Sequence, residues 1–222
     1  MKPQVPAYQI NKFLDNDAII VSDTGTVTTW AARHVMIKDR MMFSASGMLA
    51  TMGNGLPYAV GAAIGNPGRQ VVALVGDGGF TMLMGEMATI VKYKLPVKIL
   101  LFRNDVLGEI KWEQMVMNAN PQFGVQLEPI DFAAYARACG AGGFTVERPQ
   151  DCEDVLRQAF AHPGPALIEA IIDPNEPPMP GKIRTQMAIR FAEALAGGER
   201  DRGAIVKTVV EDFLKEHVRE VV

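Results

Sequence analysis

The chain has 222 residues, of which 48% are hydrophobic and 21% charged, as is typical of a globular protein with one large domain or one domain and an appendage. Its net charge of −3, without a block of basic residues, argues against nucleic acid as a partner. No uninterrupted apolar run is long enough to span a membrane, and the two cysteines have neither a metal-binding nor a disulfide spacing, so we expect a cytoplasmic location.

Five short, almost continuously apolar runs predict strands that are buried on both faces, as in a parallel sheet. Helical patterns lie between them, and two of these begin at an aspartate in the N-cap position, Asp131 and Asp151. This alternation predicts an α/β fold, a doubly wound parallel sheet with helices on both faces. In chain order we predict strands at residues 18–23 and 71–75, a helix at 81–94, a strand at 97–102, a helix at 131–139, a strand at 144–147, a helix at 151–162 and a strand at 166–172.

The end of the sequence departs from this alternation. Residues 174–181 (PNEPPMPG) predict an extended segment that leaves the sheet. The stretch at residues 182–195, a polar break at 196–203 and a helix at 204–222 follow. We therefore predict an α/β domain at residues 1–173 and a C-terminal helical appendage at residues 174–222.

Residues 76–79 (GDGG) follow the second predicted strand, at the carboxyl end where open α/β sheets bind ligands. Glycines let backbone N–H groups approach a ligand closely, and the positive end of the following helix favours an anion, so the loop suits phosphate. Neither the lysine of a Walker loop nor the third glycine of a dinucleotide fingerprint is present.

A carboxylate beside phosphates repels them unless a cation lies between. Asp77 therefore predicts Mg²⁺ or Ca²⁺, which both prefer oxygen ligands. Asn104 follows the next predicted strand, so one strand–helix–strand unit delivers a carboxylate and a carboxamide to the same edge of the sheet. A nearby backbone carbonyl, two phosphate oxygens and a water would complete an octahedral Mg²⁺ site.

These motifs resemble those of the thiamine-diphosphate-dependent enzymes, in which GDG precedes a pair of asparagines by about two dozen residues. The resemblance implies the thiamine-diphosphate-binding fold and metal ligation by Asp77, Asn104 and the carbonyl of Val106. This chain has Arg103 where the family usually has the first asparagine. The alternative, a plain glycine turn with an incidental asparagine, leaves the other shared motifs unexplained.

The resemblance extends to the residues that hold the cofactor. In the family, thiamine diphosphate is bent over a large apolar residue, which corresponds to Met52 in ATMGNGLPYAVGAA. The stretch SDTGT resembles the family's Asp-x-Gly diphosphate loop. The implied cofactor-binding residues are Asp23, Gly25, Thr26, Ala50, Met52, Gly76, Gly78, Gly79, Asn104, Val106, Leu107 and Gly108.

Among these enzymes the sequence is most similar to pyruvate oxidase and the quinone-linked pyruvate dehydrogenases, and less so to acetolactate synthase. The resemblance implies catalytic, substrate-facing positions for Ile110 and Glu113, although a glutamate on a helix is equally expected as a solvated residue. Glu109 stands where the oxidases have phenylalanine near the flavin, which puts direct electron transfer to FAD in doubt.

The family's activating glutamate lies in a separate pyrimidine-binding domain, and its oxidases bind FAD mainly in a third domain. We expect this chain to match only the diphosphate domain, as a fragment or as one subunit of a split enzyme, in a homo-oligomer (dimer or tetramer). The implied reaction is decarboxylation of pyruvate or a related 2-keto acid, followed by transfer of the carbanion to an acceptor. The alternatives are an acetolactate synthase-like carboligase and a non-catalytic cofactor-binding or scaffolding subunit.

The C-terminal helical pattern has an apolar stripe but no basic excess on its polar face. A peripheral helix on membrane lipid favours a basic face, so we expect this helix to pack on a partner subunit rather than on a membrane. The stripe consists of Ile205, Val206, Val209, Val210, Phe213, Leu214, Val218 and Val221.

Overall fold

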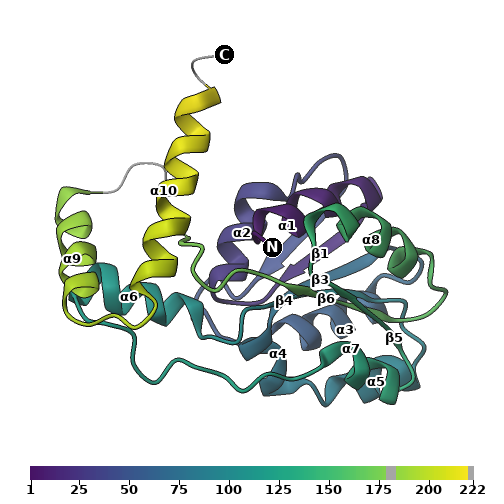
Figure 1. Ribbon diagram of the computed structural model, residues 1–222. Helices are drawn as coiled ribbons and strands as arrows, with labels where there is room; N and C mark the ends of the chain where they lie inside the picture. The colour runs from purple at the N-terminus through teal and green to yellow at the C-terminus, as the bar shows by residue number, and fades with distance from the viewer. Residues whose placement is uncertain (179–183, 220–222) are drawn as a thin grey trace. The chain divides into compact units, whose positions relative to one another are not determined.

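The computed structural model describes residues 1–178 and 184–219 (Figure 1). Contacts between residues divide the chain into two units: Met1–Asp105 with Leu127–Ile172, and Val106–Gln126 with Asp173–Val222. One of the cuts between these units lies after Ile172, one residue before the domain boundary that we predicted after residue 173. Residues 106–126, which we assigned to the α/β domain, belong to the second unit.

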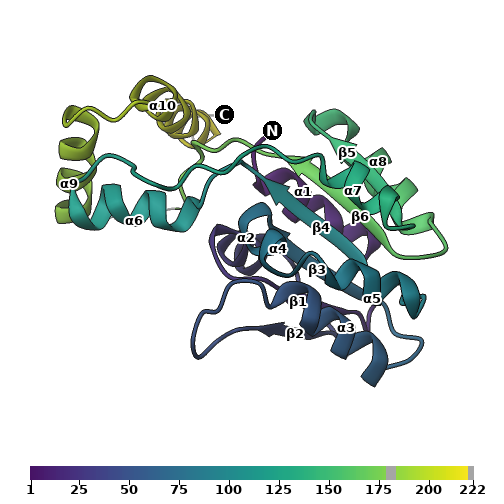
Figure 2. The same ribbon diagram turned by 90° about the horizontal axis from the view of Figure 1, so that it is seen from below.

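The first unit contains a six-stranded parallel sheet with the order β2-β1-β3-β4-β6-β5. Figure 2 shows β2 and β5 at its two edges. Every pairing of neighbouring strands is parallel, which confirms the predicted sheet. The strands are β1 (Ile19–Ser22), β2 (Met42–Ala45), β3 (Val71–Gly76), β4 (Lys98–Arg103), β5 (Gly142–Val146) and β6 (Ala166–Ile171).

Helices cover both faces of this sheet, because successive strand side chains point to opposite sides and both sides are apolar. Leu74 belongs to the hydrophobic core that contains Trp30, and the next residue, Val75, belongs to the core that contains Phe80. The first core includes α1 (Gln4–Gln9), α2 (Thr26–His34) and α8 (Cys152–Ala161); the second includes α3 (Gly55–Gly65), α4 (Asp77–Leu83), α5 (Glu86–Lys92) and α7 (Phe132–Ala138). Two short 3-10 helices, Ile10–Phe13 and Pro149–Asp151, complete the unit.

The prediction of one helix at residues 81–94 was wrong in its bounds. The helix begins at Asp77, directly after β3, so most of the predicted loop at 76–79 is the first turn of α4. A break at Met84 and Gly85 then separates α4 from α5, since glycine disfavours a helix interior. The hydroxyl of Tyr135 donates a hydrogen bond to the carbonyl oxygen of Met84 at 2.8 Å, which satisfies a carbonyl at the break.

Two further details differ from the prediction. β2 was missed, because this edge strand has only four residues and three of them are exposed, so it lacks an apolar run. Asp131 caps α7 as predicted, accepting a hydrogen bond from Ala134 N at 2.7 Å. Asp151 precedes α8 without capping it through its side chain, which instead pairs with Arg148.

The second unit contains α6 (Gly108–Asn118), α9 (Thr185–Ala196) and α10 (Arg202–Arg219). Its core includes Trp112, Met115 and Ile205. The buried ammonium group of Lys111 donates hydrogen bonds to Asn175 Oδ1 at 2.8 Å and to the carbonyl oxygen of Pro174 at 3.0 Å. Burial lowers the pKa of Lys111.

The described part of α10 has both buried and exposed apolar side chains. Ile205 is buried and Val209 packs on the same core, whereas Val206, Val210 and Phe213 are exposed. The rest of the predicted stripe, and the predicted extended segment from residue 179 onward, lie outside the described residues and side chains. Over residues 1–178 and 184–219, every helix is too short or too polar to cross a bilayer.

Candidate functional site

Three neighbouring strands end at one edge of the sheet. β1 ends at Ser22, β3 at Gly76 and β4 at Arg103, and β3 pairs with both of the others. The residues that follow are Asp23, Asp77 and Asn104. In open α/β sheets this edge is where ligands bind.

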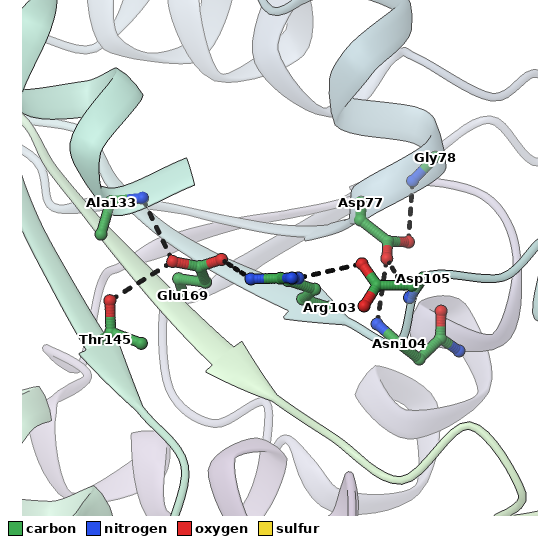
Figure 3. Close-up of polar contacts among 8 residues, drawn as sticks. All are labelled: Asp77, Gly78, Arg103, Asn104, Asp105, Ala133, Thr145 and Glu169. Atoms are coloured by element: carbon green, nitrogen blue, oxygen red, sulfur yellow. Dashed lines mark hydrogen bonds and ion pairs between the residues drawn. The ribbon is translucent and has the colours of Figure 1, made fainter. Parts of the chain in front are cut away.

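Asp77 is almost fully buried, and its carboxylate joins the end of β3 to the residues after β4 (Figure 3). Its Oδ1 accepts a hydrogen bond from Gly78 N at 2.8 Å. Its Oδ2 accepts hydrogen bonds from Asn104 N at 2.9 Å and Asp105 N at 2.6 Å. Asp77 and Asn104 therefore lie side by side, as the strand order requires.

Three N–H groups bond to the Asp77 carboxylate, which is fewer than its oxygens can accept. Each carboxylate oxygen offers about two lone-pair positions. Oδ2 uses both, for the N–H groups of Asn104 and Asp105, whereas Oδ1 uses one, for Gly78. Oδ1 is thus the oxygen with capacity for a further ligand.

Burial raises the pKa of Asp77 to about 6, although the three N–H groups oppose this shift, and the nearby Asp105 carboxylate adds to it. A cation beside Oδ1 would favour the ionised form. The described residues include no cluster of three His, Cys, Asp or Glu side chains that could hold a metal ion. One carboxylate with neutral oxygens fits Mg²⁺, which commonly takes one or two carboxylates and completes its shell with phosphate oxygens and water.

Charged side chains surround this site on the β4 side. Arg103 Nε donates a hydrogen bond to Asp105 Oδ1 at 2.9 Å, and its Nη1 donates one to Glu169 Oε1 at 2.8 Å (Figure 3). Burial alone would lower the pKa of Arg103, but the hydrogen bonds and charges of Asp105 and Glu169 outweigh it and raise that pKa. The guanidinium group therefore stays charged.

Asp23, directly after β1, is buried and holds a separate segment. Its Oδ1 accepts hydrogen bonds from Thr24 N at 2.7 Å and Gly53 N at 2.9 Å, and its Oδ2 accepts one from Gly55 N at 3.3 Å. Burial raises the pKa of Asp23, while these bonds lower it. The carboxylate thus fixes the segment that includes Met52 and Gly53, and its predicted contact with a cofactor stays a prediction.

Met52 is half-buried and lines a pocket of about 480 Å³ in the first unit. Leu83 from α4 and Tyr58 from α3 line the same pocket. Ala50 is exposed and has a left-handed φ of 47°, and its N–H donates to the carbonyl oxygen of Ser46 at 3.1 Å. The pocket therefore lies beside the segment that we predicted to contact the cofactor.

The glycines of the site differ in what surrounds them. A Cβ atom added at Gly76 would meet no other atom within 4 Å, whereas one added at Gly79 would lie 2.8 Å from Asp23 Oδ2. Gly78 is buried in the first turn of α4. Gly25 precedes Thr26, the first residue of α2, and has a φ of 126° that strongly favours glycine. The open space at Gly76 fits a ligand that approaches the backbone.

Five of the predicted residues lie in the second unit. Val106 is buried and bridges Gln126, and Leu107 N donates to the carbonyl oxygen of Val125 at 2.8 Å. Gly108 begins α6, on which Ile110 and Glu113 are both exposed. Burial, and then the charge of Glu113, raise the pKa of Glu109. The roles predicted for Val106, Leu107, Gly108, Ile110 and Glu113 stay predictions.

Sequence reasoning missed three residues of this network. Glu169 is an isolated acid within the apolar run ALIEAII, which is a signal that could have been followed. Asp105 directly follows the predicted ligand Asn104; its N–H group donates to Asp77 and its carboxylate accepts from Arg103. Arg103 was noted only as a departure from the family's asparagine.

Comparisons with known proteins identify the family of this chain. The family model "Thiamine pyrophosphate enzyme, C-terminal TPP binding domain" matches residues 23–170, and thiamine pyrophosphate is another name for thiamine diphosphate. The chain is 39% identical to the putative thiamine pyrophosphate-containing protein YdaP of Bacillus subtilis, over 87% of this chain and 33% of that protein. It is 38% identical to pyruvate oxidase of Lactiplantibacillus plantarum, over 84% and 32%, and 36% identical to the acetolactate synthase large subunit of Porphyra purpurea, over 78% and 30%.

The chain spans about a third of the length of these relatives. These relatives include a pyruvate oxidase and an acetolactate synthase, the two groups of enzymes that the sequence motifs resemble. The matched residues run from Asp23 to Ala170 in β6 and include Asp77 and Asn104. The chain therefore belongs to the thiamine pyrophosphate enzyme family, and it carries that family's C-terminal thiamine pyrophosphate-binding domain.

Proposed function

We propose that this chain supplies the Mg²⁺ and diphosphate site of an enzyme that decarboxylates pyruvate or a related 2-keto acid. One observation carries the proposal: the buried carboxylate of Asp77 lies at the carboxyl edge of the sheet, bonded to the backbone of Asn104 and Asp105. Bound thiamine diphosphate would supply the carbon nucleophile that makes decarboxylation of a 2-keto acid feasible.

In this proposal the chain's residues hold and orient the cofactor. Oδ1 of Asp77 and the carboxamide oxygen of Asn104 would bind the metal, with the carbonyl of Val106 as a third protein ligand. The backbone at Gly76, Gly78 and Gly79 would face the diphosphate, where the space at Gly76 is open. The remaining cofactor contacts would come from the predicted residues near the ends of β1 and β4 and in the segment containing Ala50 and Met52.

The proposed chemistry is completed outside this chain. A pyrimidine-binding domain or subunit would supply the activating glutamate, and Ile110 and Glu113 would face the 2-keto acid. FAD, where the whole enzyme uses it, would be bound mainly by another domain. The pyruvate oxidase relative supports transfer to an acceptor in an oxidase reaction, and we propose a homo-oligomer as the assembly.

Calorimetry with thiamine diphosphate tests the cofactor site directly on the 222-residue chain. We expect heat of binding in the presence of Mg²⁺ and its loss in EDTA. Asp77→Asn should abolish the Mg²⁺-dependent signal, because it removes the negative charge at Oδ1. Asp131→Asn, at the exposed cap of α7, is the matched control and should bind as the wild type does. A signal that survives Asp77→Asn would overturn the proposed metal site.

A carboligase is the second candidate function, because acetolactate synthases are also among the relatives. The two reactions differ in product when the assembled enzyme is given pyruvate. Acceptor-dependent acetate formation would support the oxidase and exclude the synthase, whereas acetolactate would do the reverse. An assembly that binds the cofactor but converts no 2-keto acid would support a non-catalytic subunit.

A further inference from the structure

Arg103 connects the candidate metal loop to the interior of the sheet. It is the last residue of β4, and its guanidinium group lies between two carboxylates (Figure 3). Nη1 donates to Glu169 Oε1 at 2.8 Å on one side, and Nε donates to Asp105 Oδ1 at 2.9 Å on the other. Asn104, the predicted metal ligand, lies between Arg103 and Asp105 in the chain.

Glu169 is a fixed anchor for this guanidinium group. Its side chain is 1% exposed, in the middle of β6. Its second oxygen, Oε2, accepts hydrogen bonds from Ala133 N at 3.2 Å and from Thr145 Oγ1 at 3.3 Å. Because α7, β5 and β4 all donate to this one carboxylate, Arg103 has little freedom to move, and charge-assisted bonds of this kind are strong.

Asp105 is the second partner of the Arg103 guanidinium group. Its φ of 54° lies in the left-handed region, which is uncommon outside glycine and persists where surrounding contacts hold it. In this conformation its N–H points to Asp77 Oδ2, while its own carboxylate is held by Arg103. Its carbonyl oxygen accepts a hydrogen bond from Leu127 N at 2.9 Å.

We propose that Arg103, anchored by Glu169, is a positioning residue for the metal loop: it holds Asp105 so that the N–H groups of Asn104 and Asp105 both meet Oδ2 of Asp77. Oδ1 of Asp77 is then left for the cation. The inference rests on the proposed function for its metal, but the geometry that it describes belongs to the chain alone. Arg103 touches neither cofactor nor substrate in this scheme.

The charge of Asp105 explains why a cation is needed at position 103. Two carboxylates, Asp77 and Asp105, lie at the same loop. In addition to burial, the negative charge of Asp105 raises the pKa of Asp77, because like charges repel each other. Arg103 neutralises Asp105 and turns its carboxylate toward the guanidinium group. A neutral side chain at position 103 would leave that carboxylate uncompensated beside Asp77.

The test needs a variant in which no buried charged group loses its ion-pair partner. Arg103→Gln by itself would strand the ionised Glu169, which threatens folding. The double variant Arg103→Gln/Glu169→Gln removes both charges together; Gln has the size of Glu and is shorter than Arg, and both replacements keep a polar amide. Thr145→Val is the matched control, because it removes a different hydrogen bond to Glu169 and leaves the ion pair with Arg103 intact.

The first readout is hydrogen exchange of the Asn104 and Asp105 amides, measured by NMR on the chain without ligands. We expect at least tenfold faster exchange at both amides in the double variant and wild-type exchange in Thr145→Val. Amides elsewhere in β4 should be unaffected, which a general loss of stability would not produce. Unchanged exchange at Asn104 and Asp105 would overturn the inference.

The second readout uses Mn²⁺ in place of Mg²⁺, followed by its electron paramagnetic resonance signal in the presence of thiamine diphosphate. Outer residues that orient metal ligands typically affect metal affinity by about 10-fold to 100-fold. We expect the double variant to bind Mn²⁺ at least tenfold more weakly, and adding Asp105→Asn to restore part of that loss. Unchanged or tighter binding in the double variant would contradict the positioning role.

The two readouts separate this inference from the proposed function. If the wild-type chain binds no Mn²⁺ with thiamine diphosphate, the proposed function fails, while amide exchange still decides the role of Arg103. If the double variant does not fold, Asp105→Asn alone replaces it, since it keeps the pair of Arg103 and Glu169. We then expect about threefold faster exchange at Asn104 and Asp105, because a neutral acceptor holds the guanidinium group less strongly, and unchanged exchange would again overturn the inference.

Discussion

The ends of β1 and β3 carry the same motif with different consequences. At each end a buried aspartate, Asp23 or Asp77, accepts three backbone N–H groups. The Asp23 carboxylate is tightly packed. Gly55 and Gly79 approach it so closely that a Cβ atom at either residue would lie about 3 Å from Oδ2. Asp77 has a second acid, Asp105, and a cation, Arg103, beside it.

The glycines near the two ends differ in the space around them. Gly79 and Gly55 have no room for a side chain, so the fold itself requires glycine there. Gly76 has an extended backbone, with φ −85° and ψ 157°, and open space around its Cα. Among the described residues, neither the packing nor the backbone conformation requires glycine at residue 76, which is consistent with the proposed approach of the diphosphate to this backbone.

The largest expected effect is at the β1 end. Asp23→Ala leaves the N–H groups of Thr24, Gly53 and Gly55 without their acceptor, and a buried unsatisfied donor costs about 1–3 kcal/mol. The burial that raises the pKa of Asp23 offsets part of this cost. We expect urea unfolding to show a loss of about 3 kcal/mol. A loss below about 1 kcal/mol would mean that Asp23 does not hold the segment at residues 53–55.

Gly55→Ala should be the next most damaging change. Its new Cβ atom would lie 2.5 Å from Val75 Cγ1 and 3.1 Å from Asp23 Oδ2, so the packing between α3 and β3 has to shift. Overpacking of this kind typically costs about 1–3 kcal/mol. We expect about 2 kcal/mol by urea unfolding. The matched control is Gly61→Ala on the same helix, where a Cβ atom meets nothing within 4 Å and stability should hold or rise.

Gly76→Ala should separate binding from folding at the β3 end. We expect the free energy of unfolding to change by less than about 0.5 kcal/mol, since the backbone conformation suits alanine and the space is open. The affinity for thiamine diphosphate with Mg²⁺, measured by calorimetry, should fall about tenfold, which corresponds to about 1.4 kcal/mol. Unchanged affinity would show that the diphosphate does not approach this backbone.

The smallest expected effect is a pH dependence that belongs to Asp77 alone. Its pKa is raised from 3.8 to about 6 in the folded chain, so the fold favours the protonated form. The folded state then binds more protons than the unfolded state between these values, and stability rises as pH falls from 7 through 6 toward 4.

Comparison with Asp77→Asn isolates the contribution of Asp77 to the pH dependence of stability, because residue 77 of that variant binds no proton. Between pH 7 and pH 5, without metal, the wild-type chain should gain about 1 kcal/mol of unfolding free energy relative to the variant. Urea unfolding at several pH values measures the difference. Parallel curves for the two proteins would mean that burial does not raise the pKa of Asp77.

Much of the fold was predictable because its signals are local. Apolar runs marked β1, β3, β4, β5 and β6, and the aspartate cap marked the start of α7. β2 and the break between α4 and α5 were not predictable in this way. An exposed edge strand has no apolar run. The helical spacing of the apolar residues continues across Met84 and Gly85, so the pattern hid the break, although Gly85 is a local signal that could have marked it.

The sequence by itself determined the family, the parallel α/β sheet and the meeting of Asp77 with Asn104, since consecutive strands joined by a helix end at the same edge. Only the tertiary structure decided that β4 pairs with β6, which brings Glu169 to Arg103 across 66 residues. It likewise decided that Asp23 accepts the N–H groups of Gly53 and Gly55. Such contacts depend on the order of strands in the sheet and on loop paths, and neither is written in the local pattern of residues.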